Sequence, residues 1–440
     1  MRNAHLRALL LAGLLGLTGC TSSPVITTVK EQPAPSAFTE AHQLAQSDAQ
    51  GNARQIEALL ATLDNASLSR HTAALATNDP LYALASRAML RRGLTPPHPV
   101  ERGPDLSSRA PAAADGYRPP NALAVLLPLT GNMAAAAKPV RDGLMAAYYA
   151  EQRSRPPVRF YDTSAGVIAA YQRAVAEGAD YVIGPLQRGE VDVLFAQGQL
   201  PVPVLALNRG EREPPETHIA FSLAPEDEGI AAAEWLIARQ ANRAVVILNP
   251  GDDALRRAAN AFSERLHQRG GQVVETVRLD EAPTRLNAAA ANAPIDAVYF
   301  AIRGEQARSL MPQINQNPAL ASAARIAASQ ITSGTGNAEE NRLLDGIVFP
   351  GESLQTRTVS GIPSNPGALT PTARGAAARL FAFGHDAWLI AAYPERLSRP
   401  REAGLGGATG VLKLDGFGNI TRTPDWSVLR GGVALPYSDR

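Results

Sequence analysis

The pattern of apolar and polar positions predicts a series of buried strands that alternate with amphipathic helices. The stretch 122–129 is apolar almost throughout and too short for a helix core, so it predicts a buried strand of a parallel sheet. A loop follows it, and Pro139 is expected in the first turn of the next helix, where its missing N–H costs nothing. Val140, Leu144 and Tyr148 then fall on one face of that helix.

The same unit recurs along the chain. Further strands are predicted at 158–163, 180–185, 202–208, 217–223, 243–250, 272–279, 297–302, 324–329 and 345–350. The helices between them are predicted at 166–178, at 188–197, from Pro225, from Asp252, near 283–292 and 304–315, and at 373–392. A hairpin around 415–418 and a strand from Trp426 to Tyr437 close the pattern. Two successive sets of alternating strands and helices predict an α/β protein with two Rossmann-like lobes over residues 121–440.

Residues 36–92 have helical periodicity without strands. Ser36 and Asn52 are placed to cap short amphipathic helices, and Asp79 precedes another. These helices are interpreted either as a spacer packed on the main domain or as a remnant of a tetratricopeptide-like repeat that binds a partner. Residues 93–120 are rich in proline and predict a semi-extended linker.

The first residues are typical of a targeting signal. Two arginines precede a short apolar run, and the segment 1–19 ends just before Cys20, the one cysteine of the chain. Small residues followed directly by a cysteine resemble a bacterial lipobox, which implies a lipidated Cys20 at the mature N-terminus. The alternative is an ordinary signal peptide with an incidental cysteine. Two or more acyl chains would give a stable membrane anchor, and residues 20–35 are predicted to be a tether from it.

Composition narrows the functional classes. The chain has 45% apolar and 19% charged residues with a formal net charge of +1, an ordinary balance for a globular protein. It gives no electrostatic reason to expect a nucleic-acid partner, since proteins of that class carry basic patches.

No catalytic or metal-binding motif is evident. No lysine follows a serine at the S-x-x-K spacing, no Walker A loop is present, and the seven histidines include no H-E-x-x-H. His385 and Asp386 lie in an apolar helix, which favours a core role over a catalytic one. We therefore expect no catalytic residues, no metal and no cofactor.

The order of motifs resembles the type I periplasmic-binding-protein fold over residues 121–437. The resemblance rests on the segments AVLLPLTG, VIGPL, VPVLALN and GATGVLKLDGFGNI. Together with the lipobox, FSLAPEDEG and LFAFGHDAW, they make the chain similar to the penicillin-binding protein activator lipoproteins of the LppC/LpoA type. That resemblance implies an outer-membrane lipoprotein that faces the periplasm and stimulates a class A penicillin-binding protein, a bifunctional peptidoglycan synthase. The absence of Asp after Cys20, where Thr21 stands, also favours the outer membrane. The best-known members have a much longer helical N-domain than residues 36–92.

In a fold of this type the loops after the strands line a cleft between the lobes. The residues that these loops offer are Thr130, Asn132, Thr163, Ser164, Gln187, Arg188, Asn208, Arg209, Arg303, Gln330 and Thr332. Amino-acid-binding relatives place small hydroxyl residues after the third strand, whereas this chain has Gln187 and Arg188 there. Arg188, Arg209 and Arg303 are candidates to bind an anion, or they are solvated arginines at the edges of the lobes.

Three functional hypotheses follow. The first is a non-enzymatic regulator that docks on the synthase. The second is a lipid-anchored solute-binding protein of a transport system, with a small polar ligand between the lobes. The third is an enzyme that acts on the cell wall, and the missing motifs disfavour it.

Overall fold

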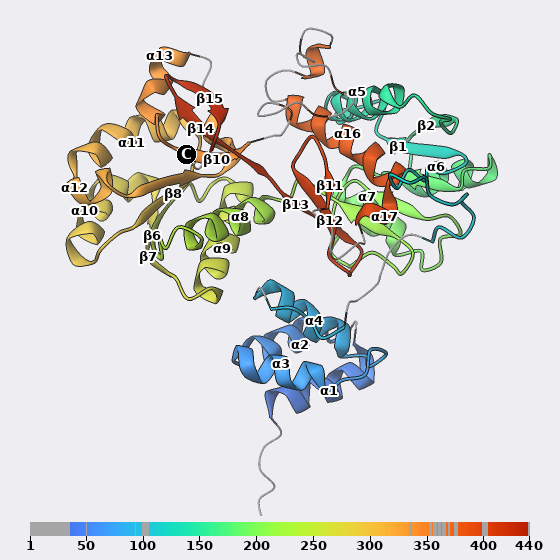
Figure 1. Ribbon diagram of the computed structural model, residues 1–440, viewed down its shortest axis with the longest axis horizontal. Helices are drawn as coiled ribbons and strands as arrows, with labels where there is room; N and C mark the ends of the chain where they lie inside the picture. The colour runs from blue at the N-terminus through green and yellow to red at the C-terminus, as the bar shows by residue number, and fades with distance from the viewer. Residues whose placement is uncertain are drawn as a thin grey trace, which may run out of the picture.

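Figure 1 shows two α/β lobes side by side, with a small group of helices beneath them. The structure is a computed structural model. It describes residues 36–49, 51–92, 94–98, 105–333, 337–351, 354, 359, 362, 367, 370–373, 377–397 and 404–438. The targeting segment, Cys20 and the tether at 20–35 therefore lie outside the described residues, as does part of the predicted linker. Among the helices that are described, none has the length and apolarity needed to cross a bilayer.

The helical segment consists of α1 (Ala37–Asp48), α2 (Ala53–Ala61), α3 (Asn65–Ala73) and α4 (Tyr82–Arg91). The Ser36 hydroxyl accepts a hydrogen bond from the Thr39 N–H, so the predicted cap is confirmed. The predicted cap at Asn52 is wrong, because its side chain bonds back to the carbonyl of Leu44. The four helices share a small apolar core of their own, formed by Phe38, Ala41, Ala45, Ile56, Leu60, Leu68, Leu81, Leu84, Ala85 and Met89.

The first lobe is built on an eight-stranded sheet in the order β11-β12-β13-β5-β4-β3-β1-β2. Its strands are β1 (Leu123–Leu127), β2 (Val158–Asp162), β3 (Tyr181–Ile183), β4 (Val204–Ala206), β5 (Ile219–Phe221), β11 (Leu405–Gly406), β12 (Val411–Leu414) and β13 (Asn419–Thr423). Helices α5 (Ala134–Ala150) and α16 (Ala377–Ala392) pack on one face. Helices α6 (Val167–Ala176) and α7 (Arg188–Phe195) pack on the other, and α17 (Pro394–Leu397) follows α16. Since β1 is buried along its whole length and pairs in parallel with β2 and β3, the prediction of a buried strand in a parallel sheet is confirmed there.

The second lobe has a seven-stranded sheet in the order β15-β14-β10-β9-β8-β6-β7. Its strands are β6 (Arg243–Leu248), β7 (Gln272–Arg278), β8 (Ala297–Ala301), β9 (Ala324–Ala327), β10 (Val348–Gly351), β14 (Asp425–Arg430) and β15 (Val433–Pro436). Helices α8 (Pro225–Ile237) and α9 (Asp253–Gln268) cover one face. Helices α10 (Ala282–Asn292), α11 (Gly304–Gln316) and α12 (Pro318–Ala321) cover the other. The short elements are α13 (Ala338–Asn341) and the 3₁₀ turns η1 (Leu279–Glu281), η2 (Ser329–Thr332), η3 (Arg342–Leu344) and η4 (Pro371–Ala373).

The chain passes between the lobes three times, so neither lobe is one continuous stretch. The crossings lie between β5 and α8, between β10 and α16, and between β13 and β14. The last crossing is visible in Figure 1, where β13 and β14 lead from one lobe into the other. The expected α/β architecture with two Rossmann-like lobes after an all-helical segment is therefore confirmed.

Two further local predictions are wrong. Pro139 lies inside α5, which begins five residues earlier at Ala134, and not in its first turn. Trp426 to Tyr437 is not one strand: Gly431 and Gly432 both adopt positive φ and turn the chain between β14 and β15. Glycine takes that conformation without the steric cost that a Cβ would impose, which explains why the strand divides there.

Candidate functional site

An open pocket of about 870 Å³ lies between the two lobes. The first lobe contributes the segments that follow β3, β4 and β5, together with α16, and the second contributes α8 and α9. Arg91, at the end of α4, also lines it. The lining consists of Arg91, Leu186, Arg188, Leu207, Asn208, Arg209, Gly210, Ser222, Leu223, Ala224, Pro225, Glu226, Asp227, Ile230, Arg257, Ala261, Glu264, Arg265, Gln268, Leu380 and Phe383.

Three of the eleven residues predicted to line a cleft are part of this pocket, namely Arg188, Asn208 and Arg209. The remaining eight do not belong to its lining, and they are Thr130, Asn132, Thr163, Ser164, Gln187, Arg303, Gln330 and Thr332. The first four of these follow β1 and β2, Gln187 precedes α7, and the last three follow β8 and β9. As ligand contacts, all eleven residues stay a prediction.

The loops after β1 and β2 are held together by Asp162. Its carboxylate accepts hydrogen bonds from the Thr130 hydroxyl at 2.7 Å, the Leu129 N–H at 2.9 Å and the Ser164 N–H at 3.0 Å. These bonds, that of Thr130 above all, lower the pKa of Asp162. The carboxylate oxygens are thus used to fix the local backbone. This role explains the positions of Thr130 and Ser164 without any bound ligand.

The other predicted residues outside the pocket also have local partners. Gln187 donates to Glu190 at 3.0 Å, and the Thr332 hydroxyl donates to the carbonyl of Ser329 at 3.1 Å. Arg303 forms an ion pair with Asp252 at 2.9 Å in the second lobe. One of the three arginines considered for anion binding is therefore already paired.

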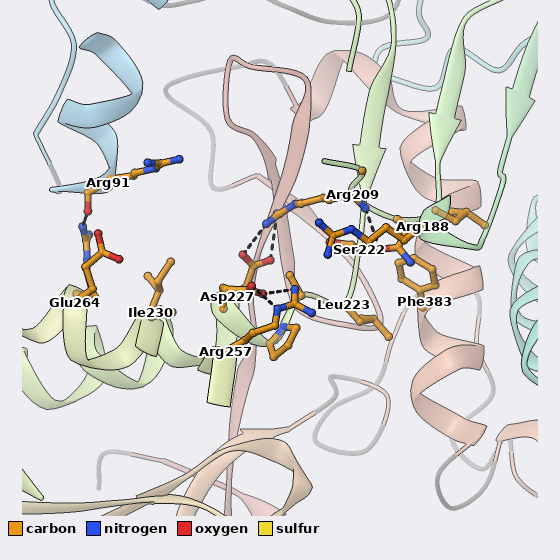
Figure 2. A pocket seen from close by; sticks show the side chains of 18 of the residues that line it. Arg91, Arg188, Arg209, Ser222, Leu223, Asp227, Ile230, Arg257, Glu264 and Phe383 are labelled. Atoms are coloured by element: carbon orange, nitrogen blue, oxygen red, sulfur yellow. Dashed lines mark hydrogen bonds and ion pairs between the residues drawn. The ribbon is translucent and has the colours of Figure 1, made fainter. Parts of the chain in front are cut away.

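The first-lobe wall of the pocket combines a cation, a hydroxyl and an aromatic ring. Arg188 is exposed at the start of α7 and pairs with no acidic group among the described residues. The Ser222 hydroxyl is buried and has no hydrogen-bond partner within that part of the chain. Figure 2 shows both beside Phe383, whose ring stacks on Phe221 with 4.5 Å between the centroids. This wall has the chemistry to accept an acidic group that carries an apolar body.

The second-lobe wall is charged but internally neutralised. Asp227 is bound by Arg209 through two contacts of 3.2 and 3.3 Å, drawn as dashed lines in Figure 2. Glu226 is bound by Arg257 at 2.7 and 2.8 Å. Burial raises the pKa of Asp227 even though Arg209 opposes that change. Arg209 is consequently engaged within the protein, as Arg303 is, so Arg188 is the predicted anion-binding arginine that this part of the structure leaves unpaired.

The site residues predicted from the sequence did not include Ser222, the acids of α8, Arg257 or Phe383. A signal for the acids was present, since three of them follow Pro225 directly, which is more than one helix end needs to complement its dipole.

The helical segment touches both lobes beside the pocket. Arg87 of α4 forms an ion pair with Glu213 and lies 4.9 Å from the ring centroid of Phe417, both in the first lobe. Arg265 of α9, in the second lobe, donates to the carbonyl of Arg91. This segment therefore spans the two lobes at one end of the pocket.

No metal-binding group is found among the described residues, where no three His, Cys, Asp or Glu side chains are placed to share an ion. His385 is fully buried and contacts Asp386 at 3.1 Å. Asp386 accepts from the N–H groups of Ala408 and Thr409 and from the Thr409 hydroxyl, at 2.6 to 2.8 Å. The pair therefore anchors the loop before β12 and does not line the pocket, in line with a core role.

Comparison with known proteins gives the chain a family. A model described as "LppC putative lipoprotein" matches residues 117–292 and 278–432. The curated "Penicillin-binding protein activator LpoA" of Dickeya chrysanthemi is 29% identical over 345 residues, which are 67% of this chain and 49% of that protein. The protein of the same name from Pasteurella multocida is 27% identical, with 70% of this chain and 54% of that protein covered. The chain thus spans about half the length of the curated relatives it matches.

Solved structures give the same fold. The LpoA (YraM) C-domain from Haemophilus influenzae, described as a regulator of PBP1A, has a TM-score of 0.63 and 23% identity, and the match covers 72% of this chain and 99% of that one. A putative branched-chain amino acid ABC transporter protein from Chromobacterium violaceum has a TM-score of 0.56 and 26% identity, covering 70% of this chain and 99% of that one. Because the family model extends across both lobes and well over half of the sequence, the chain belongs to the LppC putative lipoprotein family.

Proposed function

We propose that this protein is an outer-membrane lipoprotein that binds a class A penicillin-binding protein and activates its peptidoglycan synthesis. The observation that carries the proposal is the LppC family match across both lobes, joined by curated relatives that are named penicillin-binding protein activators. An activator must bind the active state of its target more tightly than the inactive state. The two-lobed body offers a large folded surface for that purpose.

The proposal includes the organisation of the chain. Residues 1–19 are a lipoprotein signal peptide, Cys20 carries the lipid, and 20–35 form a tether. Residues 36–92 are the small helical segment, 93–120 the linker and 121–440 the two-lobed domain. Two acyl chains on Cys20 would hold the protein at the outer membrane from the periplasmic side.

The proposal assigns no catalytic activity to the chain. The sequence lacks the nucleophile and metal motifs of cell-wall enzymes, and the curated relatives are named as activators. The role would be regulatory, exerted through contact with the synthase.

The direct test uses the chain from Thr21 onward and a purified class A synthase from the same organism. We expect faster glycan polymerisation or cross-linking from lipid-linked precursor, saturating as the activator is added. A heat-unfolded sample of the same protein is the control. Binding without any rate change at saturation would refute activation, and the absence of binding would refute the choice of partner.

The alternative of a solute-binding protein is supported by two groups in the pocket. Within the described part of the chain, Arg188 pairs with no acid and the buried Ser222 hydroxyl has no hydrogen-bond partner. It makes a different prediction, namely a small ligand that raises the melting temperature of the isolated protein. Capture experiments from solubilised envelope would separate the two, since a permease and not a synthase would be retained.

Anchoring is tested by fractionation of the envelope. We expect the natural chain in the outer-membrane fraction with radiolabelled fatty acid attached, and Cys20→Ala without label and released from that fraction. A labelled Cys20→Ala protein would contradict the proposed lipid site.

A further inference from the structure

One carboxylate, Glu228, lies where the two lobes are connected. It belongs to the first turn of α8 in the second lobe and is 3% exposed. Two arginines of the first lobe bind it: Arg379 in the first turn of α16 and Arg422 in β13, the latter at 3.5 Å. The N–H of Ser329, in the second lobe, donates to its other oxygen at 3.0 Å. Glu228 therefore joins elements of both lobes inside the protein.

These residues lie next to all three chain crossings. Glu228 follows the crossing from β5 to α8, Arg379 follows the crossing from β10 to α16, and Arg422 precedes the crossing from β13 to β14. Any rotation of the lobes must bend the chain at these crossings. A rotation about them would also change the distances from Glu228 to its two arginines.

The neighbouring acid makes a second connection of the same kind. Asp227 is bound by Arg209 of the first lobe, and Arg209 also donates to the carbonyl of Ile420 in β13 at 3.2 Å. By contrast, Glu226 and Glu234 of α8 pair with Arg257 and Arg265, which belong to α9 in the same lobe. Two acids of α8, Asp227 and Glu228, therefore pair across the lobes. The other two pair within their own lobe.

Burial makes these connections costly to break. Burial alone would raise the pKa of Glu228, but Arg379 and Arg422 outweigh it, so the pKa is lowered and the group stays ionised. Separating a buried carboxylate from its arginines leaves charges in a medium that solvates them poorly. A rotation of the lobes would separate both Glu228 and Asp227 from their arginines, so it would cost the free energy of breaking both connections.

We infer that Asp227, Glu228, Arg209, Arg379 and Arg422 form an interlobe latch that holds the two lobes at a fixed angle. The domain then acts as a rigid body that presents one surface, and it does not open and close around a ligand. This inference goes beyond the proposed function, because it concerns the motion of the domain and holds whichever protein the domain contacts.

The test measures the distance between the lobes in solution. Nitroxide labels are attached to Gln199→Cys in the first lobe and Gln316→Cys in the second, both exposed positions. The chain from Thr21 onward contains no other cysteine. Pulsed dipolar spectroscopy should give one narrow distance distribution for this protein, and a broadened or shifted one when Glu228→Gln is added.

Glu226→Gln is the matched control, because it removes the same type of charge from the same helical turn but from a pair within one lobe. We expect its distance distribution to equal that of the unaltered chain. Arg379→Gln tests the latch from the other side and leaves Arg422 beside Glu228, so it serves if Glu228→Gln fails to fold.

A broad distribution in the unaltered chain would overturn the inference. So would distributions for folded Glu228→Gln and Arg379→Gln that are as narrow, and centred at the same distance, as that of the unaltered chain. The measured quantity is a distance, so it is independent of the synthase assay. The latch can therefore be refuted while the proposed function stands, and the reverse is also true.

Discussion

Helices α5 and α16 approach each other closely enough that a single methyl group should force them apart. A Cβ built on Gly384 of α16 would lie 1.9 Å from the carbonyl oxygen of Val140, and one on Gly143 of α5 would lie 1.8 Å from that of Phe381. Real Cβ atoms essentially never approach closer than 3.0 Å, so Gly384→Ala requires the two backbones to separate by about 1.1 Å. Both helices cover the same face of the first sheet, so the separation disturbs the core around Phe383 and Trp388.

The expected loss of stability depends on the kind of atom that the new methyl group contacts. Overfilled cores lose about 1–3 kcal/mol when flexible side chains can adjust. Here the obstacle is backbone, so we expect Gly384→Ala to cost about 3 kcal/mol or more. For a domain of this size that corresponds to a fall in melting temperature of roughly 4 °C or more.

Scanning calorimetry or circular dichroism measures this effect, and Gly189→Ala is the control. Gly189 lies in α7, and a Cβ there would meet nothing within 4 Å. Alanine is the better helix former by about 1 kcal/mol, so the control should melt at the same temperature or higher. If Gly384→Ala melts as high as the control, the helices can separate at little cost and the reasoning is wrong.

Two further predictions concern buried ionisable groups and can be checked by urea unfolding. Burial lowers the pKa of His218 from 6.5 to about 4. Between those pH values the unfolded chain binds a proton that the folded chain does not, so stability should fall as the pH drops, by about 1.4 kcal/mol per pH unit at most. His218→Gln should flatten this dependence, and an unchanged slope would contradict it. Arg209→Ala leaves Asp227 buried without its partner and should cost about 3 kcal/mol, whereas exposed Arg188→Ala should change stability by less than about 0.5 kcal/mol. Equal effects of the two variants would refute the assigned pairing.

Most of the elements could be predicted from local sequence. Uninterrupted apolar runs identified the central strands, because a strand covered on both faces has no solvated side. Helix starts were readable where one residue determines the geometry: Pro225 opens α8, and the Asp252 carboxylate accepts from the Leu255 N–H at the start of α9. The predicted helix start at Pro139 was wrong, because the sequence alone does not distinguish a proline in the first turn from one tolerated inside a helix.

The pocket residues were predicted less completely than the helices and strands. Ligands in such folds bind at the loops that follow the carboxyl ends of the strands. This rule identifies candidate residues, but it does not tell which of them lie close together in the folded chain. Arg188, Asn208 and Arg209 meet at the pocket. The Thr130 hydroxyl instead bonds to Asp162 and to the Ser164 hydroxyl, and Arg303 pairs with Asp252. Such choices depend on which partner lies within a few ångströms, and that distance is set by the folded chain.

The sequence by itself determined the alternation of strands and helices, the two-lobed class and the family, because periodicity and short motifs are local properties of the chain. Only the tertiary structure decided that β11–β13 and α16 return to the first lobe while β14 and β15 complete the second. The same is true of Glu228, which lies about 150 residues or more from Arg379 and Arg422 along the chain. The reason is that contacts between the lobes depend on how the lobes pack against each other. That packing joins segments far apart in the sequence, so no local pattern predicts it.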